Sequence, residues 1–443
     1  MSDTRAGAQP AVRGGDRPSP GLPRIAYLVP EFPGQTHTWI WRELVWMRRW
    51  GAKVRMVSTR PPLDRDRARH AFAAEAAAET FYLMPREAGA TLRLLAEVVE
   101  DGVARPADLR RAIRAAQTLP VEGNRFGRRV LPLIPAAASF ARLCRTEKIA
   151  HVHCHTCARG AVVAMLAQAM GGPPYSLCIN ANLDWWGGAM AEKIGGATFS
   201  VSTMRWVYDE IVRDYPPEIS ALAHYAPVGV DTDQWRPLPV REPLTGHALN
   251  LVCVGRMHRS KGFDVALRTV RLCLDRGVDV YLRLLGDGPE RTALMALADQ
   301  LGLGGHVEFR GSVREDEVRR TMGSADIFLL PSHAEPLGVV VMEAMAMATP
   351  VIVTAAGGVR EIVTGEVDGL VVEPGNAGQL AAAVLALAGD PARRAELGRR
   401  GRESVVARFD ARIGARIVFR LIYGRDPAEP AGKVLAPAQS VGL

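Results

Sequence analysis

Two glutamates lie eight positions apart in the segment "HAEPLGVVVMEAMA" (333–346), with an almost wholly apolar stretch between them. Because a carboxylate is costly to bury, Glu335 and Glu343 need polar partners if that stretch is a packed helix. Glu335 precedes the expected helix start, where a carboxylate can accept hydrogen bonds from sugar hydroxyls or simply complement the helix dipole. Glu343 lies within the helix, where an acidic side chain can hold a ribose diol or be an ordinary exposed residue. The apolar residues that follow favour the ribose interpretation.

The same region offers groups that bind anions. We expect the helix to start at about Leu337, which leaves the N–H groups of Leu337, Gly338 and Val339 free to bind an anion. Gly338 also lets the backbone approach a ligand closely. Upstream, the loop "VGRMHRSKGFD" carries Arg256 and Lys261, two cations that suit a diphosphate, although surface loops with two cations are common. A Gly-rich turn in "LLGDGPE" is too commonplace to indicate a site alone.

The order of the motifs is more specific than any one of them. "GR(x4)KG", "GDGP", "ADIFLLPS", the two glutamates with seven residues between them, "EAMA", "TPVIVT", "GG(x2)EIV" and "DGLVVEPG" follow one another over roughly 250–400. This series resembles the C-terminal domain of the retaining nucleotide-sugar glycosyltransferases of family 4 (glycosyl transferases group 1). The resemblance implies an α/β protein of the GT-B fold, in which two Rossmann-like, doubly wound domains face a cleft.

The resemblance also implies roles for individual residues. It implies that Glu335 contacts the transferred sugar and that Arg256 and Lys261 bind the diphosphate, so these three are the expected catalytic residues. Glu343 would hold the ribose, and the base would pack against the loop Arg310–Val313. With Leu337, Gly338 and Val339 at the helix start, these residues form the expected donor site.

The N-terminal half is similar, more loosely, to the exopolysaccharide and colanic-acid-type members of that family. "PEFPGQTHTWIWREL" fits their first loop and helix, and "VHCHTC" fits their His-x-His strand end. The likeness implies that Gly34 lies beside the diphosphate and acceptor, and we expect His37, His153 and Asn180 on the acceptor or sugar side. Asn180 stands where many relatives have a histidine, and asparagine carries no proton. Either the donor is held differently or the activity is altered or lost.

A cluster of histidines and cysteines, "HVHCHTC" (151–157), raises the question of a metal. Metal ligands must converge at about 2.0–2.3 Å, and side chains two apart on a strand are spread too far to converge easily. We therefore interpret the cluster as a polar strand end that faces the cleft. "DTD" (231–233) belongs to the exit from the first domain and is not a metal motif. We expect no metal and no cofactor, with the nucleotide diphosphate sugar as co-substrate.

The elements that must position these residues alternate between strands and helices. A chain of 443 residues exceeds the size at which one core stops growing, which predicts two domains. The expected segments are a disordered start (1–22), an acceptor-side Rossmann-like domain (23–237) with a helical insertion at about 67–143, a linker (238–248), a nucleotide-sugar-binding domain (249–405), a C-terminal helix (406–425) and a disordered tail (426–443).

Composition limits the partners and the compartment. The net charge of +8 comes without a basic stripe interleaved with aromatics, so nucleic acid is not an expected partner. Either anionic lipid attracts the arginines or they decorate solvated helices. No apolar run approaches the ~18–20 residues that span a bilayer, the start is not a signal peptide, and six scattered cysteines suit a reducing compartment. We expect a cytoplasmic protein with peripheral contact to the inner face of the membrane.

Together these features predict a retaining glycosyltransferase. It would move a hexosyl group from a nucleotide diphosphate sugar to a hydroxyl of a glycan or lipid-linked sugar in cell-surface polysaccharide biosynthesis. Two alternatives stay open. One is a catalytically impaired nucleotide-sugar-binding partner subunit, which Asn180 supports. The other is a GT-B sugar-nucleotide epimerase, which should lack the paired glutamates.

Overall fold

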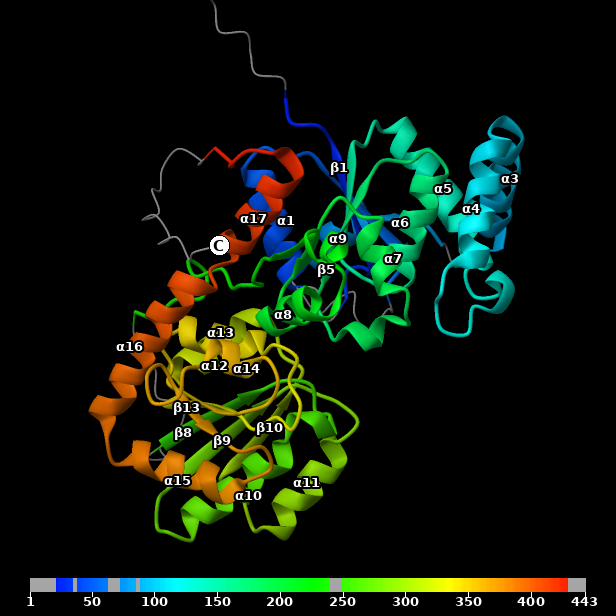
Figure 1. The fold of residues 1–443 in the computed structure, drawn as a ribbon. Coiled ribbons are helices and arrows are strands. Elements are labelled where there is room, and N and C mark those ends of the chain that lie inside the picture. The colour runs from blue at the N-terminus through cyan, green and yellow to red at the C-terminus, as the bar shows by residue number, and fades with distance from the viewer. Residues whose placement is uncertain (1–20, 35–37, 63–71, 85–87, 240–248, 429–443) are drawn as a thin grey trace, which may run out of the picture.

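The computed structural model describes residues 21–34, 38–62, 72–84, 88–239 and 249–428. Within these residues the chain forms two α/β units, one from each half of the sequence (Figure 1). Every named strand pair in both units is parallel. The predicted fold class, two doubly wound Rossmann-like domains, is therefore confirmed.

The N-terminal sheet has the strand order β3-β2-β1-β4-β5-β6-β7. Its strands are β1 (Ile25–Glu31), β2 (Val54–Arg60), β3 (Phe81–Tyr82), β4 (His151–Cys154), β5 (Tyr175–Ile179), β6 (Ser200–Ser202) and β7 (Ala223–Tyr225). Its helices are α1 (Thr38–Arg49), α2 (Ala73–Glu79), α3 (Ala88–Ala104), α4 (Pro106–Thr118), α5 (Ile134–Thr146), α6 (Arg159–Ala169), α7 (Met190–Gly195), α8 (Arg205–Asp214) and α9 (Pro217–Ser220).

The segment expected to be a helical insertion is not helical throughout its described part. β3 pairs with β2 through Val57–Phe81 and Ser58–Tyr82, and so lengthens the sheet at its edge. The strand is only two residues long, too short for a periodic pattern, so the sequence carried no strand signal there. α5 packs on α6 against the sheet, while α3 and α4 lie at the outer side of the domain (Figure 1).

The C-terminal sheet has the order β10-β9-β8-β11-β12-β13. Its strands are β8 (Leu249–Val254), β9 (Val280–Leu285), β10 (Val307–Gly311), β11 (Ile327–Leu330), β12 (Val351–Thr354) and β13 (Leu370–Val372). Its helices are α10 (Phe263–Leu274), α11 (Arg291–Gln300), α12 (Glu315–Ser324), α13 (Val339–Ala346), α14 (Val359–Ile362), α15 (Ala377–Ala388) and α16 (Pro391–Arg408). In each sheet the strand order reverses once, between β1 and β4 and between β8 and β11, which is where doubly wound sheets bind ligands.

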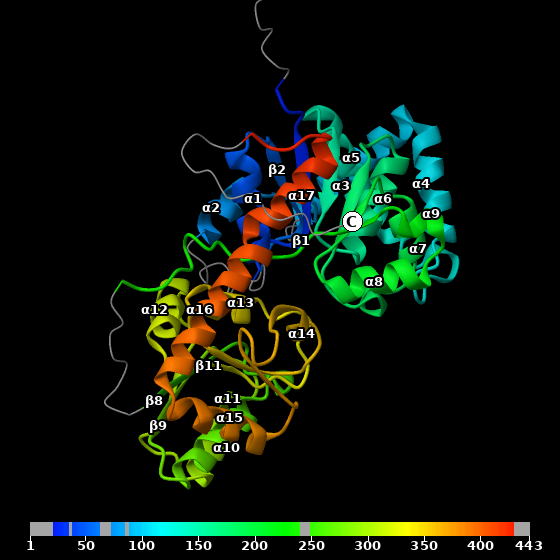
Figure 2. The same ribbon diagram turned by 60° about the vertical axis from the view of Figure 1, so that its left-hand side comes forward.

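The end of the chain returns to the first domain. α17 (Ala411–Tyr423) packs along α1, as Figures 1 and 2 show from two sides. Its apolar stripe buries Ala411, Ala415 and Phe419 against the core that covers one face of β1. An amphipathic helix gains most of its stability from such packing. The face of the N-terminal sheet opposite α5 and α6 is thus closed by both α1 and α17.

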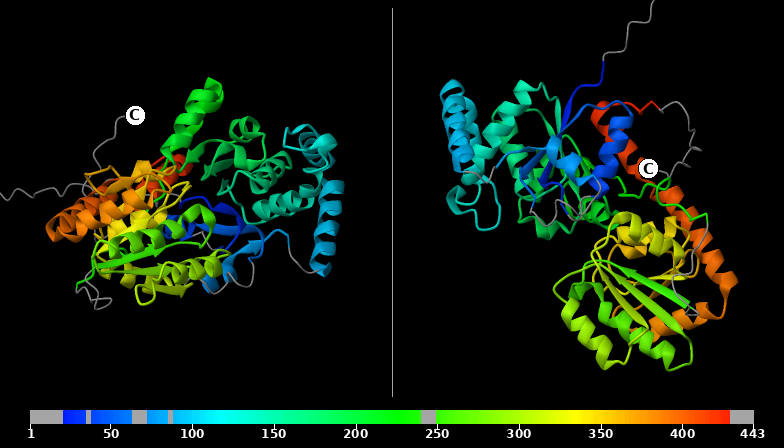
Figure 3. Two further views of the ribbon diagram at one scale, coloured as in Figure 1. Left: turned by 90° about the horizontal axis from the view of Figure 1, so that it is seen from below. Right: turned by 180° about the vertical axis from the view of Figure 1, so that it is seen from behind.

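The two chain segments that connect the domains, one at Val230 and one at 409–411, lie side by side. The backbone N–H of Val230 donates to Phe409 at 2.9 Å, and that of Ala411 donates back to Val230 at 2.9 Å. Beside them the buried Arg412 guanidinium makes two hydrogen bonds of 2.6 Å to the carboxylate of Asp410. Seen from behind, the orange and red C-terminal helices run from the second domain to the first (Figure 3).

Candidate functional site

Glu335 and Lys261 meet where the strand order of the C-terminal sheet reverses. Lys261 ends the loop after β8, Glu335 lies in the loop after β11, and Lys261 Nζ donates to Glu335 Oε2 at 2.6 Å. The loops are joined because the N–H groups of His333 and Ala334 both donate to the carbonyl of Ser260, at 2.8 and 3.2 Å. The Glu335 side chain is only 8% exposed. Two residues 74 positions apart, both expected in the donor site, therefore form one charged pair whose carboxylate is buried.

Glycines let these loops pack around Glu335. Gly262 has φ +63°, and a Cβ there would lie 1.9 Å from the carbonyl oxygen of Pro331. Gly357, in the "GG" motif, has φ +54°, and a Cβ there would lie 2.2 Å from the carbonyl oxygen of Glu335. A larger residue at either position would push the loops apart. The motif glycines therefore act by packing backbone against backbone at the carboxylate.

Glu343 is held by an arginine from the other domain. Arg42, in the second turn of α1, donates from Nη2 to Glu343 Oε1 at 2.6 Å, and the two side chains are 8% and 13% exposed. Burial raises the pKa of Glu343, and the charge and hydrogen bond of Arg42 oppose that rise. The Arg42 guanidinium lies 5.8 Å from the ring centre of Trp235, at the exit from the first domain. Glu343 is thus not an ordinary exposed helix residue, and no sequence pattern pointed to Arg42 as its partner.

A second contact joins the domains nearby. Glu361, in α14, accepts hydrogen bonds from the backbone N–H groups of Arg205 and Trp206 at 2.8 and 2.6 Å. These groups belong to the first turn of α8, whose N–H groups have no partner within the helix. Glu361 therefore caps a helix of one domain from the other domain.

The other expected donor residues make no side-chain hydrogen bond or ion pair with Glu335 or Glu343 within the described part of the chain. α13 begins at Val339, two residues after the expected start at Leu337, because Gly338 adopts φ +91° as the preceding cap. The side chain of Arg256 is exposed and makes no hydrogen bond or ion pair among the described residues. Arg310 is engaged by Glu308 at 3.0 Å and Glu317 at 2.5 Å. The guanidinium of Arg310 is therefore neutralised by two carboxylates.

Three further positions complete the expected donor and acceptor sides. Val313 packs at the margin of the core around α13, Gly34 is buried just after β1, and Asn180 is half-buried directly after β5. His37 lies outside the described residues. The roles expected for these residues stay predictions.

The expectation that His153 faces the cleft was wrong. His153 is fully buried, and its neighbours His155 and His151 are buried as well, with 1% and 9% exposure. His153 pairs in register with Tyr27, on the face of the sheet that α1 and α17 cover. The sequence could not reveal this because α17 arrives from the far end of the chain. Burial, and next the neighbouring histidines, lower the pKa of His153 well below its usual value, so its ring is neutral.

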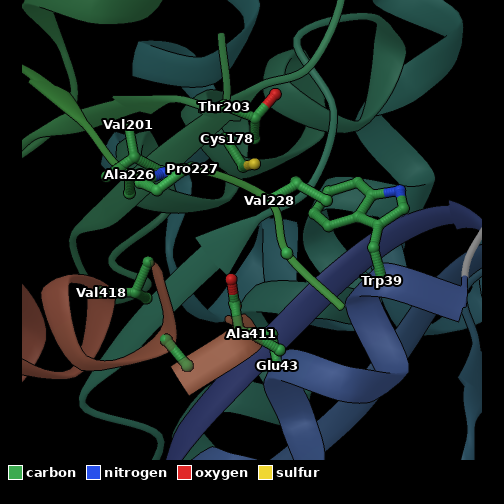
Figure 4. A pocket seen from close by; sticks show the side chains of 12 residues that line it. Trp39, Glu43, Cys178, Val201, Thr203, Ala226, Pro227, Val228, Ala411 and Val418 are labelled. Atoms are coloured by element: carbon green, nitrogen blue, oxygen red, sulfur yellow. The ribbon is translucent and has the colours of Figure 1, made fainter. Parts of the chain in front are cut away.

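A polar network lies on this covered face. The Tyr27 hydroxyl donates to Glu43 Oε1 at 2.7 Å, and the same oxygen lies 3.5 Å from His155 Nε2. Burial raises the pKa of Glu43 to about 7, although the hydrogen bond from Tyr27 lowers it. Glu43 also lines a small pocket between α1, β5 and α17 together with Trp39 and Cys178 (Figure 4). Sequence reasoning did not single out Glu43, which reads as one charge in a helix rich in tryptophan.

The two facing domains and the returning helix define the GT-B fold. The structure of Anabaena Alr3699/HepE in complex with UDP matches with a TM-score of 0.68 at 15% identity, covering 91% of this chain and all of that one. Residues 242–404 match the family model described as Glycosyl transferases group 1. This match spans the C-terminal domain.

Curated relatives point the same way. The lipopolysaccharide core biosynthesis glycosyltransferase LpsE of Rhizobium meliloti (strain 1021) is 36% identical over 159 residues, which cover 36% of this chain and 45% of LpsE. A GDP-mannose-dependent alpha-(1-6)-phosphatidylinositol monomannoside mannosyltransferase of Mycobacterium tuberculosis (strain ATCC 25618 / H37Rv) is 35% identical over 204 residues, 43% of this chain and 53% of that protein. The matches span about half the length of these relatives.

None of the described helices combines the length and the apolar composition that crossing a bilayer requires.

Proposed function

We propose that this protein is a retaining glycosyltransferase that moves a hexosyl group from a nucleotide diphosphate sugar to a hydroxyl of a glycan or lipid-linked acceptor. The observation that carries the proposal is the Lys261–Glu335 pair, 2.6 Å apart at the point where strand order reverses in a group 1 domain. The names of the relatives, a lipopolysaccharide core glycosyltransferase and a phosphatidylinositol mannoside mannosyltransferase, support a role in cell-surface glycan synthesis. The UDP bound by the Anabaena protein supports a nucleotide-sugar donor.

The reaction exchanges one bond at the anomeric carbon for another. The bond to the leaving diphosphate breaks, the bond to the acceptor oxygen forms on the same face, and the acceptor proton passes to the diphosphate. Negative charge grows on the diphosphate, where Arg256 and Lys261 can stabilise it together with the N–H groups at the start of α13. Glu335, held by Lys261, would orient the sugar through its hydroxyls.

Glu343 would bind the ribose while its carboxylate remains paired with Arg42. Arg42 uses Oε1 of Glu343, and a carboxylate has about four acceptor positions, so Oε2 stays able to accept from ribose hydroxyls. Arg42 also opposes the rise in the pKa of Glu343 that burial causes, which favours the ionised form of the carboxylate. Arg42 therefore positions the carboxylate rather than blocks it.

A membrane is the proposed location of the acceptor. α3 and the turn after α4 expose apolar side chains, with Val99, Val103 and Phe126 exposed by 66, 79 and 81%. α4 and the turn after it also carry exposed arginines, including Arg110, Arg114 and Arg128. Basic residues near a surface that carries anionic lipid each add about 1 kcal/mol of attraction. Sedimentation with phosphatidylglycerol vesicles should capture the protein and Phe126→Ser should weaken capture, while vesicles of phosphatidylcholine serve as the control.

The test of the proposed function begins with nucleotide binding. Purified protein is titrated by calorimetry with UDP, GDP and ADP, and the tightest case is repeated with Arg256→Ala and with Arg259→Ala. Both arginines are exposed on the same loop, so the second variant is a matched control. Arg256→Ala should weaken binding by about tenfold, 1.4 kcal/mol, and Arg259→Ala should not. Equal effects of both variants would mean that the loop attracts anions only through general charge.

Donor hydrolysis then separates the enzyme from a binding subunit. Slow release of free nucleotide from the matching nucleotide sugar, lost in Glu335→Gln, supports an enzyme. Tight binding without any release supports the catalytically impaired subunit, which the exchange to Asn180 still favours as the second candidate.

A further inference from the structure

Three potential metal ligands converge inside the N-terminal domain, away from the donor residues. His153 lies near the end of β4, His155 follows that strand, and Cys178 lies in the neighbouring strand β5. One ligand atom from each, a ring nitrogen or the thiol sulfur, lies within 4.8 Å of the others, and all three side chains are buried. The two imidazole centres are 4.6 Å apart and nearly perpendicular. The spacing argument for side chains two apart on a strand does not apply to this pair, because His155 lies beyond the end of β4.

The convergence follows from the end of the strand. His153 is the third residue of β4, but His155 lies beyond its last strand residue, Cys154. The chain leaves the sheet there, so His155 is no longer tied to the spacing between residues of a regular strand. Cys178 approaches from β5, which pairs with β4 in parallel register. Two strands and a turn thus supply the three groups.

One of these ligand atoms has no partner. His153 Nδ1 lies 2.8 Å from Ser176 Oγ, which also lies 2.8 Å from His151 Nε2. Nε2, on the other side of the His153 ring, is buried without any hydrogen-bond partner among the described residues. An unsatisfied buried polar atom costs about 1–3 kcal/mol. Histidines that bind metals usually have their second ring nitrogen hydrogen-bonded in this way, which fixes the ring for coordination.

A carboxylate lies beside the three converging groups, next to His155. Glu43, from α1, places Oε1 3.5 Å from His155 Nε2 and accepts a hydrogen bond from Tyr27. Figure 4 shows Glu43 and Cys178 lining one pocket, with Trp39 beside them. The pocket therefore reaches two of the four groups, Glu43 and Cys178. Tyr27 would remain bonded to Glu43 and orient it.

We propose that His153, His155, Cys178 and Glu43 form a closed site for a single zinc ion. Two imidazoles, one thiolate and one carboxylate match the nitrogen, sulfur and oxygen ligands that zinc prefers. Ligands at about 2.0–2.3 Å in a tetrahedron lie roughly 3.3–3.8 Å apart, so His153, His155 and Cys178 need to close in by about 1 Å. Glu43 would join them from its place beside His155. The ion displaces the thiol proton of Cys178. With four protein ligands and no open position, the site is structural, and it ties α1 to β4 and β5.

Metal content tests the proposal directly. The full-length, untagged chain is incubated with zinc, dialysed and analysed by plasma mass spectrometry, together with Cys178→Ser, His153→Ala and Cys157→Ser. Cys157 is the matched control, because it is also buried and its thiol lies 3.7 Å from the carbonyl oxygen of Cys178. Wild type and Cys157→Ser should retain about one zinc ion per chain, and the other two variants should retain none. Retention by Cys178→Ser equal to that of wild type would overturn the proposal.

Cobalt gives a second measurement that does not depend on how the variants fold. The wild-type protein reconstituted with Co²⁺ should show a thiolate-to-cobalt charge-transfer band and the visible absorption of a tetrahedral ion. Wild type without these bands would refute a site that contains Cys178. Zinc should also raise the melting temperature of wild type and of Cys157→Ser, because an ion that binds only the folded state stabilises it. Neither result depends on glycosyl transfer, so the site and the proposed function can fail separately.

Discussion

Glu335 and Glu343 stand eight residues apart, and each is paired with one cation at 2.6 Å, but the cations come from different domains. Lys261 reaches Glu335 from the next loop of the same sheet, whereas Arg42 reaches Glu343 from a helix of the N-terminal domain. The geometry around Glu335 is therefore built into the C-terminal domain. The environment of Glu343 exists only while the two domains are together in this arrangement.

The two pairs should consequently respond differently to mutation. Disturbing Glu335 should affect the reacting sugar and leave the relation between the domains intact. Disturbing Glu343 or Arg42 should affect nucleotide binding and the contact between domains at once.

The largest expected effect is on stability, from breaking the pair that spans the domains. Arg42→Met leaves the Glu343 carboxylate buried without its cation, and removing one partner of a buried pair costs about 3 kcal/mol. Urea unfolding of wild type, the single variant and Arg42→Met/Glu343→Gln measures this cost. The double variant should recover most of the loss, since no unpaired charge remains. A double variant no more stable than the single one would contradict this account of the pair.

Glu335→Gln should lower turnover by about 100-fold, because a misplaced reacting group is enough for a loss of that size. Nucleotide affinity should stay within a few-fold of wild type, since ribose and diphosphate contacts lie elsewhere. Initial rates of transfer or donor hydrolysis, with calorimetry on the same samples, separate the two quantities. If affinity fell as far as turnover, Glu335 would be part of the nucleotide site instead.

Glu343→Ala should show the converse pattern. Loss of the ribose contacts should weaken nucleotide binding about tenfold, or 1.4 kcal/mol, while bound donor still reacts. Calorimetry with the nucleoside diphosphate and with inorganic pyrophosphate provides the check. Pyrophosphate binding should be unchanged, because it has no ribose for Glu343 to bind.

Glu361→Ala should cost about 1 kcal/mol, the usual value of a helix cap. The carboxylate caps α8 from the opposite domain through two hydrogen bonds of 2.8 and 2.6 Å. Its loss should therefore increase hydrogen exchange at Arg205 and Trp206 more than elsewhere in α8. An equal increase in exchange at all residues of α8 would mean that Glu361 does not hold the start of the helix.

The smallest expected effect is a change in pH dependence. Burial raises the pKa of Glu343 and Arg42 opposes the rise, so in Arg42→Met the pKa should rise further. An ionised carboxylate is needed to accept from both ribose hydroxyls. Affinity for the nucleotide should thus fall as pH decreases through that pKa, and fall earlier in Arg42→Met than in wild type. Calorimetry from mildly alkaline to mildly acidic pH, with Arg42→Lys as the charge-conserving control, measures the difference.

Much of the fold was predictable because its signals are local. Short apolar runs ended by Gly or Pro became strands such as β1 and β8, and helical spacing of apolar residues became α1. Exceptions occurred where such a pattern was too short, as in the two-residue strand β3, or where a glycine cap moved a boundary, as at Gly338 before α13.

Part of the candidate site was predictable for a related reason. Lys261 and Glu335 both follow parallel strands, whose carboxyl ends lie along the same edge of a sheet, so their proximity followed from the strand order. Arg42 could not be found in this way. It lies 301 residues from Glu343 and has the appearance of any basic residue on a helix.

The sequence by itself determined the alternation of strands and helices, the GT-B architecture and the carboxylates around which the donor site is expected. Hydrophobic periodicity, turn residues and motif spacing are properties of short segments, so they can be read without coordinates. Only the tertiary structure decided that Arg42 pairs with Glu343 and that His153, His155 and Cys178 converge in the interior. Those outcomes depend on α1 meeting α13 and on α17 covering the N-terminal sheet, and packing between segments hundreds of residues apart leaves no mark in the local pattern of either.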